Sequence, residues 1–596
     1  MKKFIYPSIF IILFFILLYL FYPKTIENGI YVKTTNGKYE ILNTGKSIHI
    51  RSTSNSLEKY QVINCTYNFF KTYNLEIQIP IKERIMVKKE NSYELEHEGS
   101  VALDTSSYFY KIDENNEISL CTSKDLIVGK ENIETFYNKN GFLQTFLIYP
   151  MNYSKMRVAI SDNSFKSIYH ENLTIKCLED TKLINYLENK ELDLPKDSLL
   201  TVTYNTESIL ITTDKEPYQF DKRTYLIGTK FTINEITRGW PKFNADYTDT
   251  LELYPTPKGI ILINELATEE YLKRVVPSEM PTTGGLDSLK CQAVAARTYA
   301  ISDMLNNRYA YLGFHVDDST KCQVYNNTPL KDLTTQAVNE TEGQVLLFNN
   351  KPIDAKYYST SSGYGADFNN IWFRLDSDPT NIPYLTTNNF MESKILKPMS
   401  EEDWLNFYKN EELQSYDSLS PYFRWKINFS QSELVEIFKK SLVYNFENSR
   451  EYMKIFANGK EKNDFPTELS ELKDIIVLER SEGGNVIEIS FIFKEVTINI
   501  RKDNNIRRCF NNGADIISST INIERRDSSQ LELWSTLPSS FFSVEKKENN
   551  FTVYGGGFGH GVGMSQYGAM YLSQNGYKYN HILSIYYKDT ELEKLY

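Results

Sequence analysis

The chain has 596 residues and a formal net charge of −11, with 41% hydrophobic and 24% charged residues. This length is too great for one hydrophobic core and the composition is that of a folded protein, so roughly two to four domains are expected. The acidic balance argues against a general nucleic-acid binder, because neutralising phosphates needs a basic surface.

The first residues predict a membrane anchor over residues 1–23. Two lysines precede an almost unbroken apolar run from Phe4 to Tyr22, close to the ~20 residues with which a helix crosses a bilayer. The lysines favour the cytoplasmic side, so the chain after Pro23 is expected to be exported. The run ends without a small-residue cleavage site, which favours an uncleaved anchor over a cleaved signal peptide.

Residues 24–225 show the pattern of antiparallel β structure. Short runs of β-branched and aromatic residues alternate with turn residues, as at 29–33, 47–51, 199–204 and 208–212. The sequence here shows no repeat, metal cluster or catalytic pattern. We expect a β-rich extracytoplasmic region with a spacing or binding role that the sequence does not specify.

Residues 226–596 predict a larger α+β domain with segregated helices and strands. Leu251–Tyr254 and Gly259–Asn264 predict a β-hairpin, and Leu266–Val276 a short helix. Apolar residues at three- and four-residue intervals predict a stronger helix from Leu286 to Met304. Further along, the composition predicts strands to residue 363, charged helices at 400–470, strands at 475–500 and 518–524, and a final helix at 569–583.

The cysteines are too few and too scattered for a disulfide scaffold in an exported protein of this size. Most are expected to be small buried side chains. They are Cys65, Cys121, Cys177, Cys291, Cys322 and Cys509.

Glu279 is the best candidate for an acid or base. It lies between Pro277 and Pro281, which predict a stiff, extended corner. Apolar neighbours would partly desolvate the carboxyl, and desolvation raises a carboxyl pKa, as a general acid near neutral pH requires. The alternative is a carboxylate that caps a helix or pairs with a surface lysine.

A glycine-rich loop near the C-terminus is the second candidate. Residues 555–569 hold seven glycines around His560 and the triplet Ser565-Gln566-Tyr567. Such density indicates positive φ angles or a close backbone approach, and the apolar residues between the glycines argue against a flexible linker.

Weaker alternatives are a thiol nucleophile and a metal site. Cys291 with His560 would make a nucleophile and its base, but no orienting carboxylate is evident. His315, Asp317, Asp318 and Cys322 cluster without the spacing of a known ligand pattern.

Three motifs resemble the stage II sporulation protein D (SpoIID)/LytB family. They are Val275–Pro281, Leu289–Ala300 and Gly555–Ala569. The segments 420–426, 477–484, 505–508 and 537–542 fit the same family in the same order, so the resemblance covers about residues 225–596. Residues before it are not covered.

The resemblance implies a membrane-anchored peptidoglycan lytic transglycosylase at the outer face of the cytoplasmic membrane. In a sporulating cell this face opens on the space between mother cell and forespore. Family members cleave MurNAc-β-1,4-GlcNAc bonds of denuded glycan strands, leave 1,6-anhydro ends, and work with a cell-wall amidase and other proteins of engulfment. Glu279 would be the single catalytic carboxyl.

The resemblance also implies a set of substrate-binding residues. Each of them has the alternative of a structural hydrogen-bonding or surface role. They are Lys290, Gln292, Arg297, Ser359, Ser361, His560, Ser565, Gln566 and Tyr567.

One departure from the family concerns zinc. Some members carry a Cys- and His-rich stretch, but residues 315–325 retain only Cys322, so no metal or other cofactor is expected. A second function remains open, because the LytB branch is associated with enhancing an amidase, and the same groove could grip glycan without cutting it.

Overall fold

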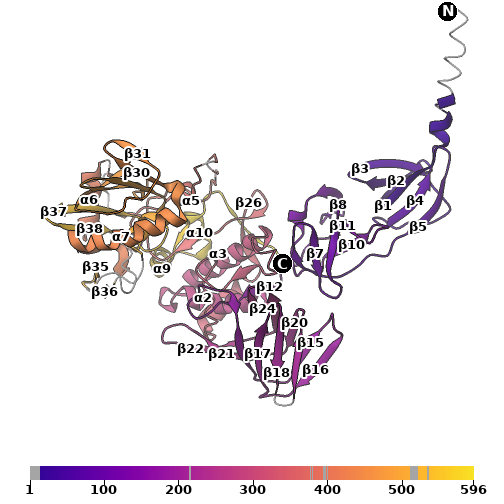
Figure 1. Ribbon diagram of the computed structural model, residues 1–596, viewed down its shortest axis with the longest axis horizontal. Coiled ribbons are helices and arrows are strands. Elements are labelled where there is room, and N and C mark those ends of the chain that lie inside the picture. Colours follow the sequence, from indigo (N-terminus) through magenta and orange to yellow (C-terminus); the bar gives the residue numbers. More distant parts are fainter. Residues whose placement is uncertain are drawn as a thin grey trace, which may run out of the picture. The chain divides into compact units, whose positions relative to one another are not determined.

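A computed structural model describes residues 14–15, 17–213, 216–375, 377–378, 380, 382–392, 397–398, 400–510, 521–532 and 536–596. Over these residues the protein is a mixture of strands and helices, which confirms the α+β class (Figure 1). The chain forms two compact units. The first comprises Met1–Thr268 and Asp303–Asn327, and the second comprises Glu269–Ser302 and Thr328–Tyr596.

The predicted boundary at residue 225 falls within the first unit. The division into an anchor, a β-rich region and a catalytic domain stays a prediction. Of the predicted anchor, residues 1–13 and 16 lie outside the described residues, and residues 14–15 and 17–21 are helical. Among the helices that the structure describes, none is long and apolar enough to span a bilayer.

The first unit is built from β-sheets. One sheet has the order β3-β2-β1-β4-β5, with β1 Lys24–Thr35, β2 Lys38–Asn43, β3 Lys46–Arg51, β4 Val62–Tyr67 and β5 Thr72–Ile77. A second has the order β10-β11-β8-β7-β6 with β9 on β8, formed by β6 Ile85–Lys88, β7 Ser92–Leu95, β8 Gly99–Ile112, β9 Ile118–Cys121, β10 Ile133–Tyr137 and β11 Leu143–Ile148.

Two more sheets complete this unit. One is ordered β16-β15-β20-β23-β24-β12-β25 with β13 on β24, from β12 Lys155–Ala159, β13 Tyr169–His170, β15 Thr181–Asn185, β16 Lys190–Leu194, β20 Thr224–Ile227, β23 Thr250–Thr256, β24 Gly259–Ala267 and β25 Val316–Asp317. The other is ordered β19-β18-β17-β14-β21-β22, from β14 Asn172–Cys177, β17 Leu199–Asn205, β18 Ser208–Thr212, β19 Pro217–Phe220, β21 Phe231–Arg238 and β22 Phe243–Tyr247. The predicted strands and the β23–β24 hairpin are confirmed.

The second unit carries most of the helices. They are α2 Thr268–Glu279, α3 Leu286–Leu305, α4 Asp332–Glu340, α5 Phe368–Trp372, α6 Glu401–Lys409, α7 Gln431–Asn448, α8 Asp503–Cys509, α9 Gln566–Gln574 and α10 Tyr579–Tyr586. The first residue of α2 and the last three of α3 belong to the first unit.

Its sheets are small. One has the order β31-β30-β34-β33-β32, with β30 Met453–Ala457, β31 Lys460–Lys462, β32 Leu472–Arg480, β33 Val486–Phe493 and β34 Thr497–Arg501. Another has the order β36-β35-β29-β38-β37, with β29 Trp425–Ser430, β35 Asn522–Arg525, β36 Gln530–Glu532, β37 Phe542–Lys547 and β38 Asn550–Gly555. Shorter pairings join β26 Gln344–Phe348 to β27 Lys351–Pro352 and β40 Glu591–Lys594, and β28 Tyr357–Tyr358 to β39 Met564–Ser565.

Local chemistry explains where several of these helices begin and end. Ser400 and Ser430 each form a capping box with the acid three residues on, which starts α6 and α7. Trp425–Ser430 breaks the predicted helical region at 400–470 with a buried strand. The predicted final helix is two helices, because the chain turns at Gly576, where φ is +85°.

Candidate active site

Glu279 is the last residue of α2 and is half-buried. The prediction of an extended corner is wrong, because α2 continues through Pro277. Proline disfavours helix at the preceding residue, but burial of Val275 and Val276 outweighs this local preference. The Ser278 hydroxyl bridges the Arg274 carbonyl at 2.6 Å and the Thr328 hydroxyl at 2.8 Å, which fixes the helix end that presents Glu279.

Tyr357 pairs with Glu279. It lies in β28, is half-buried, and its phenol is hydrogen-bonded to the Glu279 side chain. Burial raises the pKa of Tyr357 well above its usual range, and the negative charge of Glu279 and the nearby Tyr271 raise it further. The phenol therefore stays protonated and donates to the carboxylate. No local motif marks Tyr357, and the sequence-based predictions did not include it.

Lys356 brings a positive charge to the neighbouring position. Its ammonium lies 3.1 Å from the Asp354 carboxylate, 4.5 Å from the ring centroid of Tyr299 and 5.6 Å from that of Trp372. These contacts hold the lysine along aromatic faces rather than free in solvent. Lys356 thus brings a positive charge next to Tyr357 in the sequence and contacts the indole of Trp372, the last residue of α5.

His560 is hydrogen-bonded to the backbone of the segment around β28. Its Nδ1 accepts a hydrogen bond from the Val562 amide at 3.1 Å, which leaves Nε2 for the hydrogen bond to the backbone of Tyr357. The ring centroid lies 4.9 Å from that of Trp372 and 5.6 Å from that of Tyr358. Burial and the charge of Lys356 lower the pKa of His560 to about 3, so the imidazole is neutral near pH 7. Both nitrogens are bonded to backbone, which makes His560 a poor proton shuttle.

The glycine loop lies against the segment 356–366. Its amides and carbonyls bond to that segment, for example Met564 N–H to the Lys356 carbonyl at 3.0 Å. A Cβ at Gly563 would overlap the same carbonyl, and Gly563 has a φ of +78°. Glycine is required there because two backbones approach closely. The loop therefore packs its backbone against the strand β28 and holds it in place. The close approach that the glycine allows is to the protein's own backbone.

Two of the three predicted serines of this region, Ser361 and Ser565, are hydrogen-bonded to Asp417, which the sequence-based predictions also missed. Asp417 is fully buried; it accepts hydrogen bonds from the Ser361 amide at 2.9 Å and from the Ser565 hydroxyl. Ser565 also caps α9 by accepting from the Gly568 amide. Burial raises the pKa of Asp417 to about 7 despite these donors.

The remaining loop residues lie close by. The Ser359 carbonyl accepts a hydrogen bond from the Tyr567 amide at 3.1 Å, and the Ser359 hydroxyl lies 3.2 Å from that of Thr360. Gln566 donates to the side-chain oxygen of Gln292 at 3.3 Å, and both residues are buried. The structure thus brings the glycine loop, helix α3 and the 356–363 segment together.

The two cations on α3 that were predicted to bind substrate each form an ion pair with a glutamate of the protein. Arg297 is fully buried and forms a two-pronged ion pair with Glu269 at 2.8 and 2.6 Å, with a further bond to the Gln344 carbonyl. Lys290 pairs with Glu340 and lies over the ring of Tyr579. Arg297 therefore ties α2 to α3. Substrate contact by either cation stays a prediction.

The structure does not support the thiol nucleophile or the metal site. The Cys291 thiol is fully buried, lies 3.5 Å from the Tyr579 carbonyl, and burial raises its pKa well above the usual range, so it stays a thiol. In the first unit, the ring nitrogens of His315 bond to Arg157 and Val128 backbone atoms. Among the described residues, no group of three or more His, Cys, Asp or Glu side chains is arranged to hold a metal. All six cysteines are free.

Comparisons with known proteins agree with the motifs. Residues 256–348 match the family model described as stage II sporulation protein (SpoIID), and residues 366–563 match a domain of unknown function. Glu279 lies within the segment that matches the SpoIID model, and Asp417 and His560 lie within the second matched segment. The resemblance of this chain to the SpoIID/LytB family is confirmed.

Individual relatives are distant. The chain is 26% identical over 331 residues to an amidase enhancer of Bacillus subtilis, covering 54% of this chain and 40% of that protein. It is 26% identical over 347 residues to stage II sporulation protein D of the same organism, covering 56% of this chain and 76% of that protein. An uncharacterized protein of Brachyspira hyodysenteriae is 27% identical over 362 residues.

Proposed function

We propose that this chain is a peptidoglycan lytic transglycosylase that cleaves MurNAc-β-1,4-GlcNAc bonds of denuded glycan strands and leaves 1,6-anhydro ends. The observation that carries the proposal is the half-buried Glu279 carboxyl, held at the end of α2 and hydrogen-bonded by the Tyr357 phenol. Matches to proteins named stage II sporulation protein D and amidase enhancer support a cell-wall function connected with sporulation.

The reaction needs one carboxyl rather than the two of most glycosidases. Protonated Glu279 gives its proton to the glycosidic oxygen as the bond from that oxygen to C1 of MurNAc breaks. The C6 hydroxyl of the same sugar attacks C1, and its proton passes to the Glu279 carboxylate. The products are a free 4-hydroxyl on GlcNAc and an anhydro ring, and the acid is regenerated without water.

Tyr357 suits both halves of this cycle. A carboxylic acid has two oxygens, so a phenol that donates to one leaves the other to carry the proton toward the substrate. Once the proton has left, the same hydrogen bond becomes charge-assisted and stabilises the carboxylate that must accept the next proton. Tyr357 is thus a positioning residue for Glu279.

The predicted anchor would place this chemistry at a membrane. Residues 1–23 would hold the chain in the cytoplasmic membrane as a single span, with the rest outside it. In a sporulating cell the second unit would then act in the space between mother cell and forespore during engulfment. A cell-wall amidase would supply the denuded strands.

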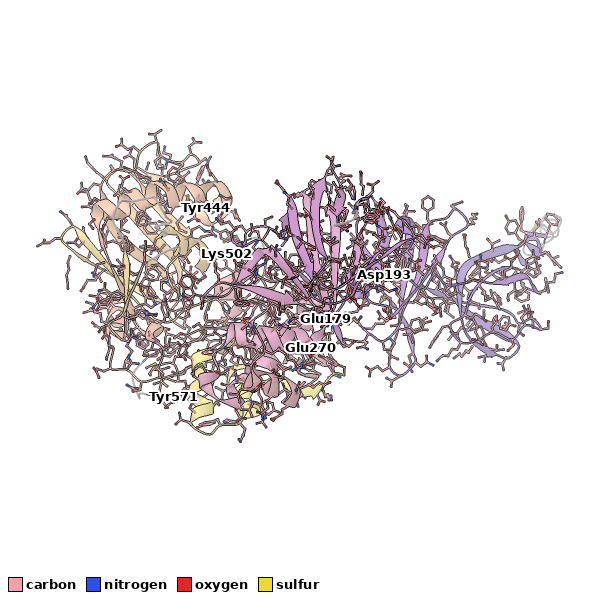
Figure 2. All side chains as sticks on the ribbon, turned by 90° about the horizontal axis from the view of Figure 1, so that it is seen from below. Glu179, Asp193, Glu270, Tyr444, Lys502 and Tyr571 are labelled. Carbon is pink, nitrogen blue, oxygen red and sulfur yellow. The ribbon has the colours of Figure 1, made fainter. Side chains whose placement is uncertain are left out.

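Cleavage of purified denuded glycan strands tests the proposal. The wild-type chain is expected to release anhydro-ended fragments, detected by mass spectrometry, and Glu279→Gln is expected to release none. The matched control is Glu270→Gln on the same helix (Figure 2), where the carboxylate pairs with Lys273 at 2.6 Å and activity should persist. Equal product from Glu279→Gln, or none from wild type, would refute the assignment.

A second function is favoured by the match to an amidase enhancer. In this case the chain grips glycan without cutting it and stimulates a cell-wall amidase. Addition of wild type or Glu279→Gln to an amidase on peptide-bearing peptidoglycan separates the two functions. Equal stimulation by both, without anhydro products, identifies the enhancer.

A further inference from the structure

One end of the β1–β5 sheet exposes a group of aromatic side chains. Phe21 and Tyr22, which are separated from β1 by Pro23, are 59% and 63% exposed. Phe69 and Phe70, in the turn between β4 and β5, are 62% and 45% exposed. Single exposed aromatics are common on soluble proteins, whereas adjacent exposed aromatics mark an interaction surface. We call residues 19–22 and 68–71 the aromatic end; the strands β1, β4 and β5 next to it are labelled in Figure 1.

The two segments of the aromatic end contact each other. The ring centroids of Phe21 and Phe70 are 4.7 Å apart, and those of Phe69 and Phe70 are 5.3 Å apart. The Phe69 amide donates to the Leu20 carbonyl at 3.2 Å. The turn is thus attached to the helical residues that end the long apolar run of the N-terminus.

The turn holds its shape through its own hydrogen bonds. The Asn68 side chain accepts from the amides of Phe70 and Lys71 at 2.9 and 3.0 Å, and the Asn68 amide donates to the Lys71 carbonyl at 2.9 Å. An Asx turn of this kind is stabilised by hydrogen bonds within the turn itself. It holds Phe69 and Phe70 on the surface of the sheet, where they are 62% and 45% exposed.

Lysines flank the aromatic residues. The Lys24 ammonium lies 4.1 Å from the Tyr19 ring centroid and 2.9 Å from its hydroxyl, and Lys71 lies 5.3 Å from the ring of Tyr73. Aromatic side chains with lysines beside them are typical of the boundary between bilayer and water, where the rings reach headgroup depth and the ammonium groups meet lipid phosphates.

We propose that the turn Asn68–Lys71 lies in the lipid interface beside the end of the N-terminal helix, so that the β1–β5 sheet has two contacts with the bilayer. This rests on the membrane anchor of the proposed function and adds a second contact to it. The occupant of the aromatic end is the lipid surface itself. A single helix lets an attached domain swivel, whereas two contacts fix one end of the sheet at the membrane.

Photo-crosslinking of the full chain in vesicles of phosphatidylcholine and phosphatidylglycerol tests this. Phe69 and Phe70 are replaced one at a time by p-benzoylphenylalanine, and lipid adducts are measured by mass spectrometry. The matched control is Phe142, which is 40% exposed in the turn between β10 and β11 of the same unit. We expect several-fold more lipid adduct from positions 69 and 70 than from position 142.

Two outcomes would overturn the proposal, and they differ. If the chain stays with the vesicles after alkaline carbonate but positions 69, 70 and 142 give equal adducts, the turn is not in the interface and the anchor survives. If carbonate removes the chain, the anchor fails and the turn with it. Neither readout depends on glycan cleavage, so failure of the transglycosylase activity is a separate result.

Discussion

The Tyr357 phenol donates a hydrogen bond to the Glu279 carboxylate, and the backbone of the same tyrosine is bonded to the His560 ring. One residue of a two-residue strand therefore joins the proposed acid to the glycine loop. Its side chain and its backbone serve different partners, so changes in the loop and changes in the acid can be separated by mutation.

Tyr357→Phe should lower kcat with little change in KM. A hydrogen bond to a charged group contributes about 1.5–3 kcal/mol, and about 1.4 kcal/mol corresponds to tenfold in rate, so a fall of about 10- to 100-fold is expected. Steady-state release of anhydro products measures it. Tyr358→Phe, the next residue of β28, is the control and should retain the wild-type rate. An unchanged kcat in Tyr357→Phe would remove the positioning role.

Arg297→Met should reduce stability and leave KM unchanged in the folded fraction. The substitution leaves the Glu269 carboxylate without its two-pronged partner, at a cost of about 3–5 kcal/mol. Calorimetry should show a lower Tm, and Arg297→Met with Glu269→Gln should recover part of it. A raised KM at unchanged Tm would instead place Arg297 in substrate binding, as the family resemblance implies.

Asp417 should make the second unit less stable as pH rises. Burial raises its pKa in the folded protein to about 7, whereas an aspartate in the unfolded chain titrates at about pH 3.9, so the unfolded chain binds fewer protons between these pH values. Protonated Asp417 therefore contributes to the free energy of unfolding below about pH 4, and this contribution is lost progressively as the pH rises toward about 7. The loss in the free energy of unfolding is on the order of 4 kcal/mol. Asp417→Asn should flatten the dependence of Tm on pH over this range. An identical slope in the variant would contradict the prediction.

Gly563→Ala should be far more damaging than Gly576→Ala. Both glycines have positive φ, +78° and +85°, which costs an alanine about 1–2 kcal/mol. Only Gly563 also places the new Cβ against the Lys356 carbonyl, whereas Gly576 has open space. Overlap adds about 1–3 kcal/mol. Urea denaturation compares the pair, and equal losses would show that the loop is free to move away from the 356–366 segment.

Local patterns predicted the elements better than the contacts between them. The apolar periodicity of 286–304 correctly predicted helix α3, and the two short apolar runs at 251–254 and 259–264 correctly predicted the β23–β24 hairpin. The helical backbone at Glu279 was not predicted. The preference that proline imposes on the preceding residue is local, whereas the burial of Val275 and Val276 that outweighs it depends on the tertiary structure.

The site shows the same division. Glu279 and the glycine loop are visible as motifs, because unusual spacing marks them in one stretch of chain. Tyr357 and Asp417 carry no such mark, since their partners lie far away in sequence and only the folded chain brings them together. Arg297 looks like a solvated helix charge in sequence, and nothing local reveals that Glu269 is its partner.

The parallel pairing of Tyr357 and Tyr358 with Met564 and Ser565 has a consequence for the timing of activity. A ribosome releases Glu279 and Tyr357 long before residues 564–565, so a growing chain holds the acid without the strand that seats its hydrogen-bond donor. The strand pairing that holds Tyr357 can therefore form only after nearly all of the chain has been synthesised. A protein able to cut the wall of its own cell would stay harmless until its C-terminal loop had closed.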